Sequence, residues 1–158
     1  MANRFLIDVS QIDEPSWLSR VEPFMQALAK ELSVDGQEVS VLFCDDATIQ
    51  GLNKNYRNID AATDVLSFEN GEKFRDEDGV EWLLAGDIAI SVDTLKKNAE
   101  YFECDENSEL KRLLLHGLLH LNGYDHGEEH IQKGKEPECE MLKLQEDILL
   151  KFKGEKLI

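Results

Sequence analysis

Three of the chain's four histidines lie within residues 116–126. His116 and His120 are four residues apart, so on a helix both imidazole rings would project from one face. Gly123 can adopt the left-handed conformation that ends a helix, and the reversed chain would return His126 to the other two. Three neutral imidazoles that converge on one point form a transition-metal site, most often for zinc. Three protein ligands leave a fourth position for water, as in catalytic zinc sites.

The histidine spacing matches the metzincin pattern, with histidines at the first, fifth and eleventh positions and glycine at the eighth. In metzincins a glutamate follows the first histidine and acts as the general base of peptide hydrolysis. Gly117 stands at that position here, beside the predicted metal, and can neither take nor give a proton. The sequence therefore predicts metal-assisted hydrolysis of a substrate other than a peptide. Three imidazoles also suit nickel, copper or iron.

The alternative interpretation is that these histidines are ordinary core residues. The segment 113–121 is apolar on nearly every side, which predicts a buried helix. Burying two imidazoles without partners would cost on the order of 1–3 kcal/mol each. A metal is the simplest partner that both rings could share. The fourth histidine, His130, is predicted to lie on the surface.

Three sequence blocks carry a resemblance to a known family, and the resemblance covers nearly the whole chain. They are His-Gly-Leu-Leu-His-Leu-Asn-Gly-Tyr-Asp-His at 116–126, Leu-Asn-Lys-Asn-Tyr-Arg at 52–57 with Thr-Asp-Val-Leu-Ser-Phe at 63–68, and Gly-Asp-Ile-Ala-Ile-Ser at 86–91. In their order along the chain, these blocks resemble the bacterial YbeY family of metal-dependent endoribonucleases. The resemblance implies a zinc-dependent endoribonuclease that cleaves single-stranded RNA, acting in maturation of the 16S ribosomal RNA 3′ end and in ribosome quality control.

The resemblance also implies a catalytic arginine, Arg57, which on composition alone would be an ordinary surface residue. Its guanidinium would bind the scissile phosphate in a planar fork and stabilise the negative charge that grows in the transition state. Two nucleophiles are consistent with such a site, a water molecule activated by the metal and the ribose 2′-hydroxyl. The implied partners are single-stranded ribosomal RNA and ribosomal or ribosome-associated proteins, with no DNA and no membrane.

Further residues are candidates for the surroundings of the metal. Asp125 could orient a ligand histidine through its second ring nitrogen. Asp64 and Asp87 are candidates for the cleft, although helix-cap or strand-end roles are favoured for both. Ser67, in the second block, and Gly117 complete this set of residues predicted near the cleft.

The net charge opposes an RNA substrate. Thirty-three acidic residues against seventeen basic ones give −16, which repels a polyanion. Proteins that bind RNA non-specifically usually have the opposite balance. The acidic runs at 69–81 and 128–146 are interpreted as solvated faces. A locally positive opening around the metal and Arg57, a protein partner or magnesium would then supply the attraction.

Length and cysteine usage indicate a small intracellular enzyme. Residues 1–158 are predicted to form one metallohydrolase domain, which is long enough for a hydrophobic core. Three cysteines that are far apart, Cys44, Cys104 and Cys139, favour reduced thiols over a disulfide framework. The first residues contain no signal-peptide pattern, and no segment has the apolar length of a membrane span. The expected location is the cytoplasm.

Secondary-structure patterns place these residues on an α+β fold. Alternation predicts strands at 4–9, 39–44 and 65–68 and a further strand within 83–92, with an acidic loop or hairpin near 78–79. Helical spacing and capping residues predict helices at 15–28, 45–56, 93–99, 108–121 and 137–152. We expect a mixed, mainly parallel four-stranded sheet in two or three layers, with the metzincin-like metal helix packed on it. The resemblance makes 65–68 the edge strand of the cleft.

Three functions are therefore compared. A metallo-endoribonuclease is implied by the resemblance, and a metal hydrolase of another substrate, such as a peptidase, shares the histidine spacing. A ribosome assembly factor with a structural zinc is the non-enzymatic alternative. Gly117 disfavours the peptidase, and an open metal position would disfavour the assembly factor.

Overall fold

The computed structural model describes residues 3–126 and 137–158. Its strands are β1 (Arg4–Ser10), β2 (Gln37–Cys44), β3 (Val65–Arg75) and β4 (Glu81–Ser91). Its helices are the 3-10 turn η1 (Leu18–Arg20), α1 (Val21–Glu31), α2 (Asp46–Arg57), α3 (Val92–Tyr101), α4 (Glu106–Leu121) and α5 (Glu140–Lys151).

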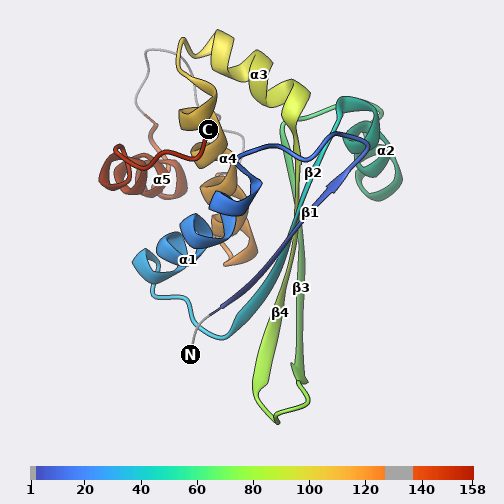
Figure 1. The fold of residues 1–158 in the computed structure, drawn as a ribbon, viewed down its shortest axis with the longest axis vertical. Helices are drawn as coiled ribbons and strands as arrows, with labels where there is room; N and C mark the ends of the chain where they lie inside the picture. The colour runs from blue at the N-terminus through green and yellow to red at the C-terminus, as the bar shows by residue number, and fades with distance from the viewer. Residues whose placement is uncertain (1–2, 127–136) are drawn as a thin grey trace.

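The strands form one mixed sheet in the order β1-β2-β4-β3. β1 pairs with β2, and β2 with β4, in parallel, whereas β3 and β4 form an antiparallel hairpin. The predicted α+β class with a mainly parallel sheet of four strands is thus confirmed, and β3 is an edge strand as expected. The hairpin extends beyond the helices as a long two-stranded arm (Figure 1).

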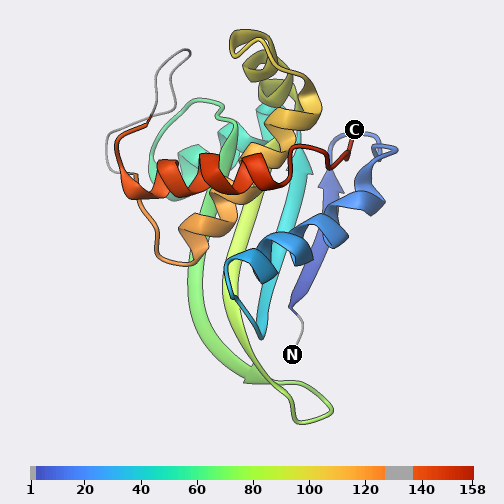
Figure 2. The same ribbon diagram turned by 90° about the vertical axis from the view of Figure 1, so that its left-hand side faces the viewer.

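Helices cover both faces of the sheet, but unequally. α1, α4 and α5 lie on one face and α2 lies on the other (Figures 1 and 2). Alternate residues of β2 and β4, such as Val41 and Ile88, point into the main core with the leucines of α4. Ala89 and Leu66 instead contact Ile49 of α2 in a smaller cluster. Because successive side chains of a strand point to opposite faces of the sheet, α4 packs on one face and α2 packs on the other.

Capping residues decide where the helices begin. Asp45 accepts a hydrogen bond from the Thr48 amide at 2.9 Å and starts α2, as predicted. α4 was predicted to start at residue 108 but starts at Glu106. The reason is that Asp105 caps the helix by accepting a hydrogen bond from the Ser108 amide at 2.7 Å. α1 starts only at Val21, so Pro23 lies in its first turn, where no intrahelical amide donor is needed.

The hairpin is longer than the prediction of a strand at 65–68 followed by an acidic loop. β3 continues to Arg75 because its backbone N–H and C=O groups form hydrogen bonds with those of β4. This pairing persists although the side chains along the arm are mostly exposed and many are charged. The pairing shifts between Glu69 and Glu72, opposite Gly86, which has a φ of +146°. A Cβ at Gly86 would lie 2.0 Å from the Phe68 carbonyl oxygen, so only glycine fits this irregularity.

Three further sequence predictions concern the chain as a whole. Among the described residues, Cys44, Cys104 and Cys139 form no disulfide. Within residues 3–126 and 137–158, no helix combines the length and apolar character that crossing a membrane requires. His130 lies outside the described residues.

Candidate metal centre and its cleft

Helix α4 places two of the three predicted ligands side by side. His116 and His120 are one turn apart, and their Nε2 atoms lie 3.2 Å from each other. Leucines before and between them are fully buried against the sheet and the other helices. The histidine-bearing face of α4 therefore turns toward a cleft while the rest of the helix is fixed by the core.

The end of α4 brings in the third ring. Gly123 has a φ of +87°, and the Tyr124 amide donates to the Leu119 carbonyl at 3.1 Å, which closes the helix end. The His126 ring centroid is 5.2 Å from those of both His116 and His120. One ligand nitrogen from each histidine lies within 4.8 Å of the other two. The structure thus brings together the three residues that the spacing predicts.

The protonation of His116 fits a metal ligand. Its Nδ1 donates to the Gln145 side-chain oxygen at 2.8 Å, which leaves a lone pair on the Nε2 that faces His120. Burial lowers the pKa of His116 to about 4, and burial also lowers that of His120. Both rings are therefore uncharged at neutral pH, as metal binding requires.

The spacing of the nitrogens also fits. Metal–nitrogen bonds of about 2.0–2.1 Å in a tetrahedron place two ligand nitrogens roughly 3.3 Å apart. The Nε2 atoms of His116 and His120 are 3.2 Å apart. These three histidines can hold one metal ion.

Gln145 is a further residue of the site that was not predicted from the sequence. It lies on α5 and is fully buried, on the same face as Met141, Leu142 and Ile148. A glutamine within an otherwise apolar helix face was a usable signal, because a buried amide needs a hydrogen-bond partner. Its hydrogen-bond partner His116 lies 29 residues away, so only the folded chain brings the two side chains together.

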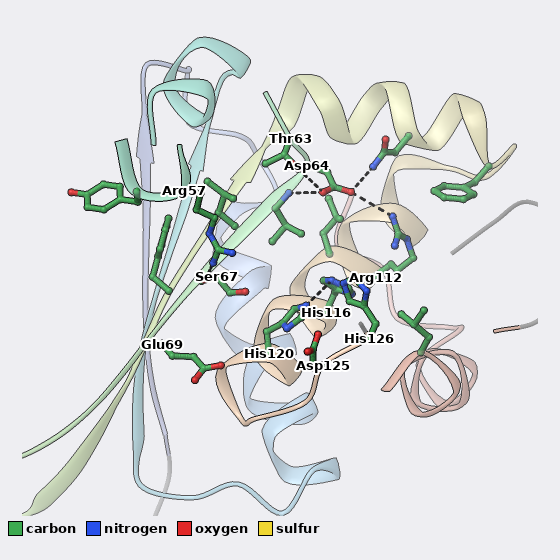
Figure 3. A pocket seen from close by; sticks show the side chains of 18 of the residues that line it. Arg57, Thr63, Asp64, Ser67, Glu69, Arg112, His116, His120, Asp125 and His126 are labelled. Carbon is green, nitrogen blue, oxygen red and sulfur yellow. Dashed lines mark hydrogen bonds and ion pairs between the residues drawn. The ribbon is translucent and has the colours of Figure 1, made fainter. Parts of the chain in front are cut away.

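The histidines lie at one side of a cleft of about 1000 Å³, between β3, α3 and α4. Figure 3 shows Arg57 and Ser67 on the wall that faces the histidines. Arg57, at the end of α2, donates to the Ser67 carbonyl and lies 5.4 Å from the Phe68 ring centroid. These contacts hold the exposed guanidinium at the cleft wall. β3 is thus the edge strand that borders the cleft.

A partly buried polar network forms another part of the cleft wall. Arg112 pairs with Glu109 through two hydrogen bonds of 2.8 and 2.6 Å. Asn98 donates to Glu109 at 3.0 Å and to Asp64 at 2.9 Å, and Asp64 also accepts from the Val65 amide at 2.7 Å. Asp64 therefore anchors the start of β3, the strand-end role that was favoured for it. Arg112, which lies one turn before His116 on the same face of α4, was not predicted from the sequence.

The remaining predicted residues separate into those inside and those outside the cleft. Asp125 and Ser67 line the cleft, and Asp125 lies beside His120 (Figure 3). Burial lowers the pKa of His120, and the negative charge of Asp125 acts in the opposite direction. Asp87 is exposed on β4 and is not among the described residues of the cleft lining, so its prediction as a cleft residue is corrected.

The prediction that Gly117 lies beside the metal is also corrected. A Cβ at Gly117 would lie 2.9 Å from Ile88 Cγ2, so this glycine faces the sheet. Successive residues of a helix point about 100° apart, and the position after a cleft-facing histidine therefore turns toward the core.

Comparison with known proteins gives a consistent result. A sequence model of the family described as "Endoribonuclease YbeY" matches residues 5–153. A Treponema denticola protein named "Endoribonuclease YbeY" is 51% identical over 151 residues, covering 94% of each chain. A protein of that name from Aquifex aeolicus is 37% identical, covering 84% of this chain and 82% of its own. The solution structure of a Thermotoga maritima protein superposes with a TM-score of 0.62 at 26% identity, covering 95% of this chain and 89% of that one.

Proposed function

The chain belongs to the YbeY endoribonuclease family, and from this premise we propose that it hydrolyses phosphodiester bonds of single-stranded RNA in the cleft beside His116, His120 and His126. The observation that supports this most is the shared cleft. Three convergent imidazoles and the Arg57 guanidinium line the same opening. Such a site combines a place for a metal with a donor for a phosphate.

We propose one zinc ion as the cofactor, bound by the three histidines, and nickel is the next candidate. When bound, such a metal supplies Lewis-acid polarisation of a phosphoryl oxygen and lowers the pKa of coordinated water. Gln145 accepts a hydrogen bond from His116 Nδ1 and so fixes the orientation of the ring. The lone pair on His116 Nε2 is then available to a metal.

Arg57 is the proposed catalytic residue. Its guanidinium already donates to a neutral acceptor, the Ser67 carbonyl, and its exposed remainder can donate to a phosphate. A donor held at the wall before the substrate arrives stabilises growing negative charge without reorganisation. Phosphate recognition by a planar fork explains why an arginine serves this position better than a lysine.

Two alternatives are less well supported. A peptidase of the metzincin type needs a glutamate after the first histidine, and Gly117 faces Ile88 instead of the metal. A purely structural metal normally has four protein ligands. The described residues supply three, and they open onto a cleft of about 1000 Å³.

The proposed physiological role is maturation of the 16S ribosomal RNA 3′ end in the cytoplasm, with ribosome quality control. A chain with a net charge of −16 gains little from non-specific attraction to RNA. We therefore propose that ribosomal or ribosome-associated proteins deliver the substrate. Neither DNA nor a membrane is a proposed partner.

The deciding experiment incubates the metal-loaded protein with a single-stranded RNA, the same RNA in a duplex, and a peptide library. We expect endonucleolytic cleavage of the single strand, loss of that cleavage after chelation, and no peptide hydrolysis. His120→Ala is the matched variant, and it should lose both metal and cleavage. Peptide hydrolysis in place of RNA cleavage would overturn the proposal, as would RNA cleavage that His120→Ala and chelation leave intact.

A further inference from the structure

Two exposed tyrosines line the cleft. The exposed fraction of Tyr56 is 71% and that of Tyr101 is 59%, yet both belong to the cleft wall. They come from separate helices, Tyr56 from the last turn of α2 and Tyr101 from the end of α3. Neither the metal centre nor the Arg57 contact makes use of these rings.

Each tyrosine is supported from behind in the same way. The Tyr56 ring packs edge-on against Phe68 at a centroid distance of 5.5 Å, and the Tyr101 ring packs edge-on against Phe102 at 4.9 Å. An arginine lies over each phenylalanine, Arg57 at 5.4 Å from the Phe68 ring and Arg112 at 4.9 Å from the Phe102 ring. These contacts restrict the tyrosines while most of each ring stays open to solvent.

The charges of the cleft do not suit a polyanion. Arg57 and Arg112 line it, but so do the carboxylates of Asp64, Glu69 and Asp125. Arg112 is moreover paired with buried Glu109 through two hydrogen bonds, which balance its charge. Among the side chains of this cleft, phosphate attraction therefore depends mainly on the Arg57 guanidinium, which would act beside the proposed metal ion. Affinity for RNA needs a contribution that does not come from charge.

We propose that Tyr56 and Tyr101 are stacking surfaces for unpaired bases of the RNA substrate, one on each helix. This inference rests on the proposed function and assigns the ligand of two residues at that site. Every base has a π-face, so stacking on an aromatic ring tolerates any sequence. Bases in a duplex are already stacked and paired, so these surfaces select single strands.

The test measures binding of a fluorescent twelve-residue oligo(dA), which a ribonuclease leaves intact and whose bases stack as those of RNA do. The metal-loaded full chain is titrated, and a matched twelve-residue abasic oligonucleotide carries the same phosphates without bases. We expect base-bearing DNA to bind more tightly than abasic DNA. Tyr56→Leu and Tyr101→Leu should each weaken oligo(dA) binding by about 5- to 150-fold, a range that corresponds to one stacked base.

Conservative variants separate stacking from structural damage. Tyr56→Phe and Tyr101→Phe keep the ring and should bind oligo(dA) within about twofold of the original chain, whereas the leucine variants keep only apolar bulk. All four variants should bind the abasic strand as the original chain does, and melting temperatures check their folding. The slope of log K against log salt should be no steeper than about −1.4, the value for two phosphate contacts on a single strand.

Several outcomes would overturn the proposal. Equal affinity for base-bearing and abasic strands would do so, as would leucine variants that bind oligo(dA) like the original chain. Cleavage of single-stranded RNA is measured in parallel with the original chain. Cleavage without any stacking effect leaves the endoribonuclease function standing and removes only the tyrosines. A stacking effect without RNA cleavage would keep the two tyrosines as base-stacking surfaces and would remove the endoribonuclease function.

Discussion

At the scale of single residues, the groups proposed to bind the metal and the phosphate lie on different elements of the cleft. The histidines lie on α4 and the segment after it, whereas Arg57 lies at the end of α2 and contacts β3. Each group is held by a neighbour, His116 by Gln145 and Arg57 by the Ser67 carbonyl. Metal affinity and catalysis can therefore be altered separately by substitution.

Arg57→Ala is expected to lose catalysis while it keeps the fold and the metal. Arg57 is exposed and supplies none of the ligand nitrogens. Loss of a donor aimed at developing charge should lower the rate on the order of 10²–10³-fold, and Arg57→Lys should recover part of it. Single-turnover cleavage of a defined single-stranded RNA measures this, with metal content and melting temperature as controls. Full activity of Arg57→Ala would remove this residue from the site.

Gln145→Leu is expected to weaken metal binding by about 10- to 100-fold, the usual effect of removing a group that orients a ligand histidine. The leucine fills most of the same buried space but accepts no hydrogen bond from His116 Nδ1. Gln145→Glu keeps an acceptor oxygen at this place and should retain affinity. Competition with a fluorescent zinc chelator gives the dissociation constants. Equal constants for the leucine variant and the original chain would contradict the assignment.

At the scale of elements, helix packing decides where the site lies. α4 rests on β4 at Gly117, where the absence of a side chain allows close approach to Ile88. α2 carries Tyr56 and Arg57, and it is tied to α3 by Asp46, which accepts from Thr94 Oγ1 at 2.6 Å. The positions of α4 and α2, which carry residues of the cleft wall, are thus set by their contacts with β4 and α3.

Gly117→Ala is expected to destabilise the fold by about 1–2 kcal/mol, because overpacking a core usually costs more than the better helix propensity of alanine returns. The new Cβ would lie 2.9 Å from Ile88, which is 1% exposed and fixed in the core. In an Ile88→Ala background the same substitution should be neutral or stabilising. Urea unfolding of the four chains gives the coupling energy. Additive effects would show that the contact is not the cause.

Asp46→Asn is expected to lower stability at pH 7 by about 1 kcal/mol. Partial burial of Asp46 acts to raise its pKa, but hydrogen bonds from Ser91, Thr94 and Lys97 outweigh burial and hold the pKa at about 2. Because this pKa lies below the ordinary 3.8, the carboxylate's contribution is present above about pH 4 and is lost as the pH falls toward 2. Urea unfolding at pH 7 and pH 3 should therefore show a smaller difference at pH 3. A difference that stays constant would exclude the ionised carboxylate as its source.

At the scale of the whole molecule, the proposed metal would join parts that are distant in sequence. The three histidines link α4 to the chain that follows it, and Gln145 extends this link to α5. The net charge of −16 is spread over the rest of the molecule, including the exposed arm of β3 and β4. A bound metal should therefore stabilise the packing of α4 and α5.

Metal removal is expected to lower the melting temperature by roughly 5–10 °C. A ligand at 100 times its dissociation constant stabilises a fold by about 2.7 kcal/mol, and a chain of this size shifts by about 2–4 °C per kcal/mol. Thermal unfolding with zinc, with nickel and with a chelator measures the change. His120→Ala should show no such shift. A melting temperature insensitive to every metal would argue against the proposed site.

The sequence alone determined the parts of the site that depend on local structure. The spacing of His116 and His120 on one helix face, and the helix end at Gly123, each depend on only a few neighbouring residues. The α+β class and the order of most elements likewise followed from periodicity and capping. Helix and strand ends were less well predicted, since Asp105 and the pairing of β3 with β4 decided them.

Only the tertiary structure decided which distant residues share the cleft. Gln145 is 29 residues from its partner His116, and Asn98 joins Asp64 to Glu109 across three elements. Gly117 was predicted beside the metal because it is adjacent to His116 in sequence, but the packing of α4 on β4 turns it to the sheet. Such placements depend on how helix faces meet the sheet, and local residue patterns carry no record of that contact.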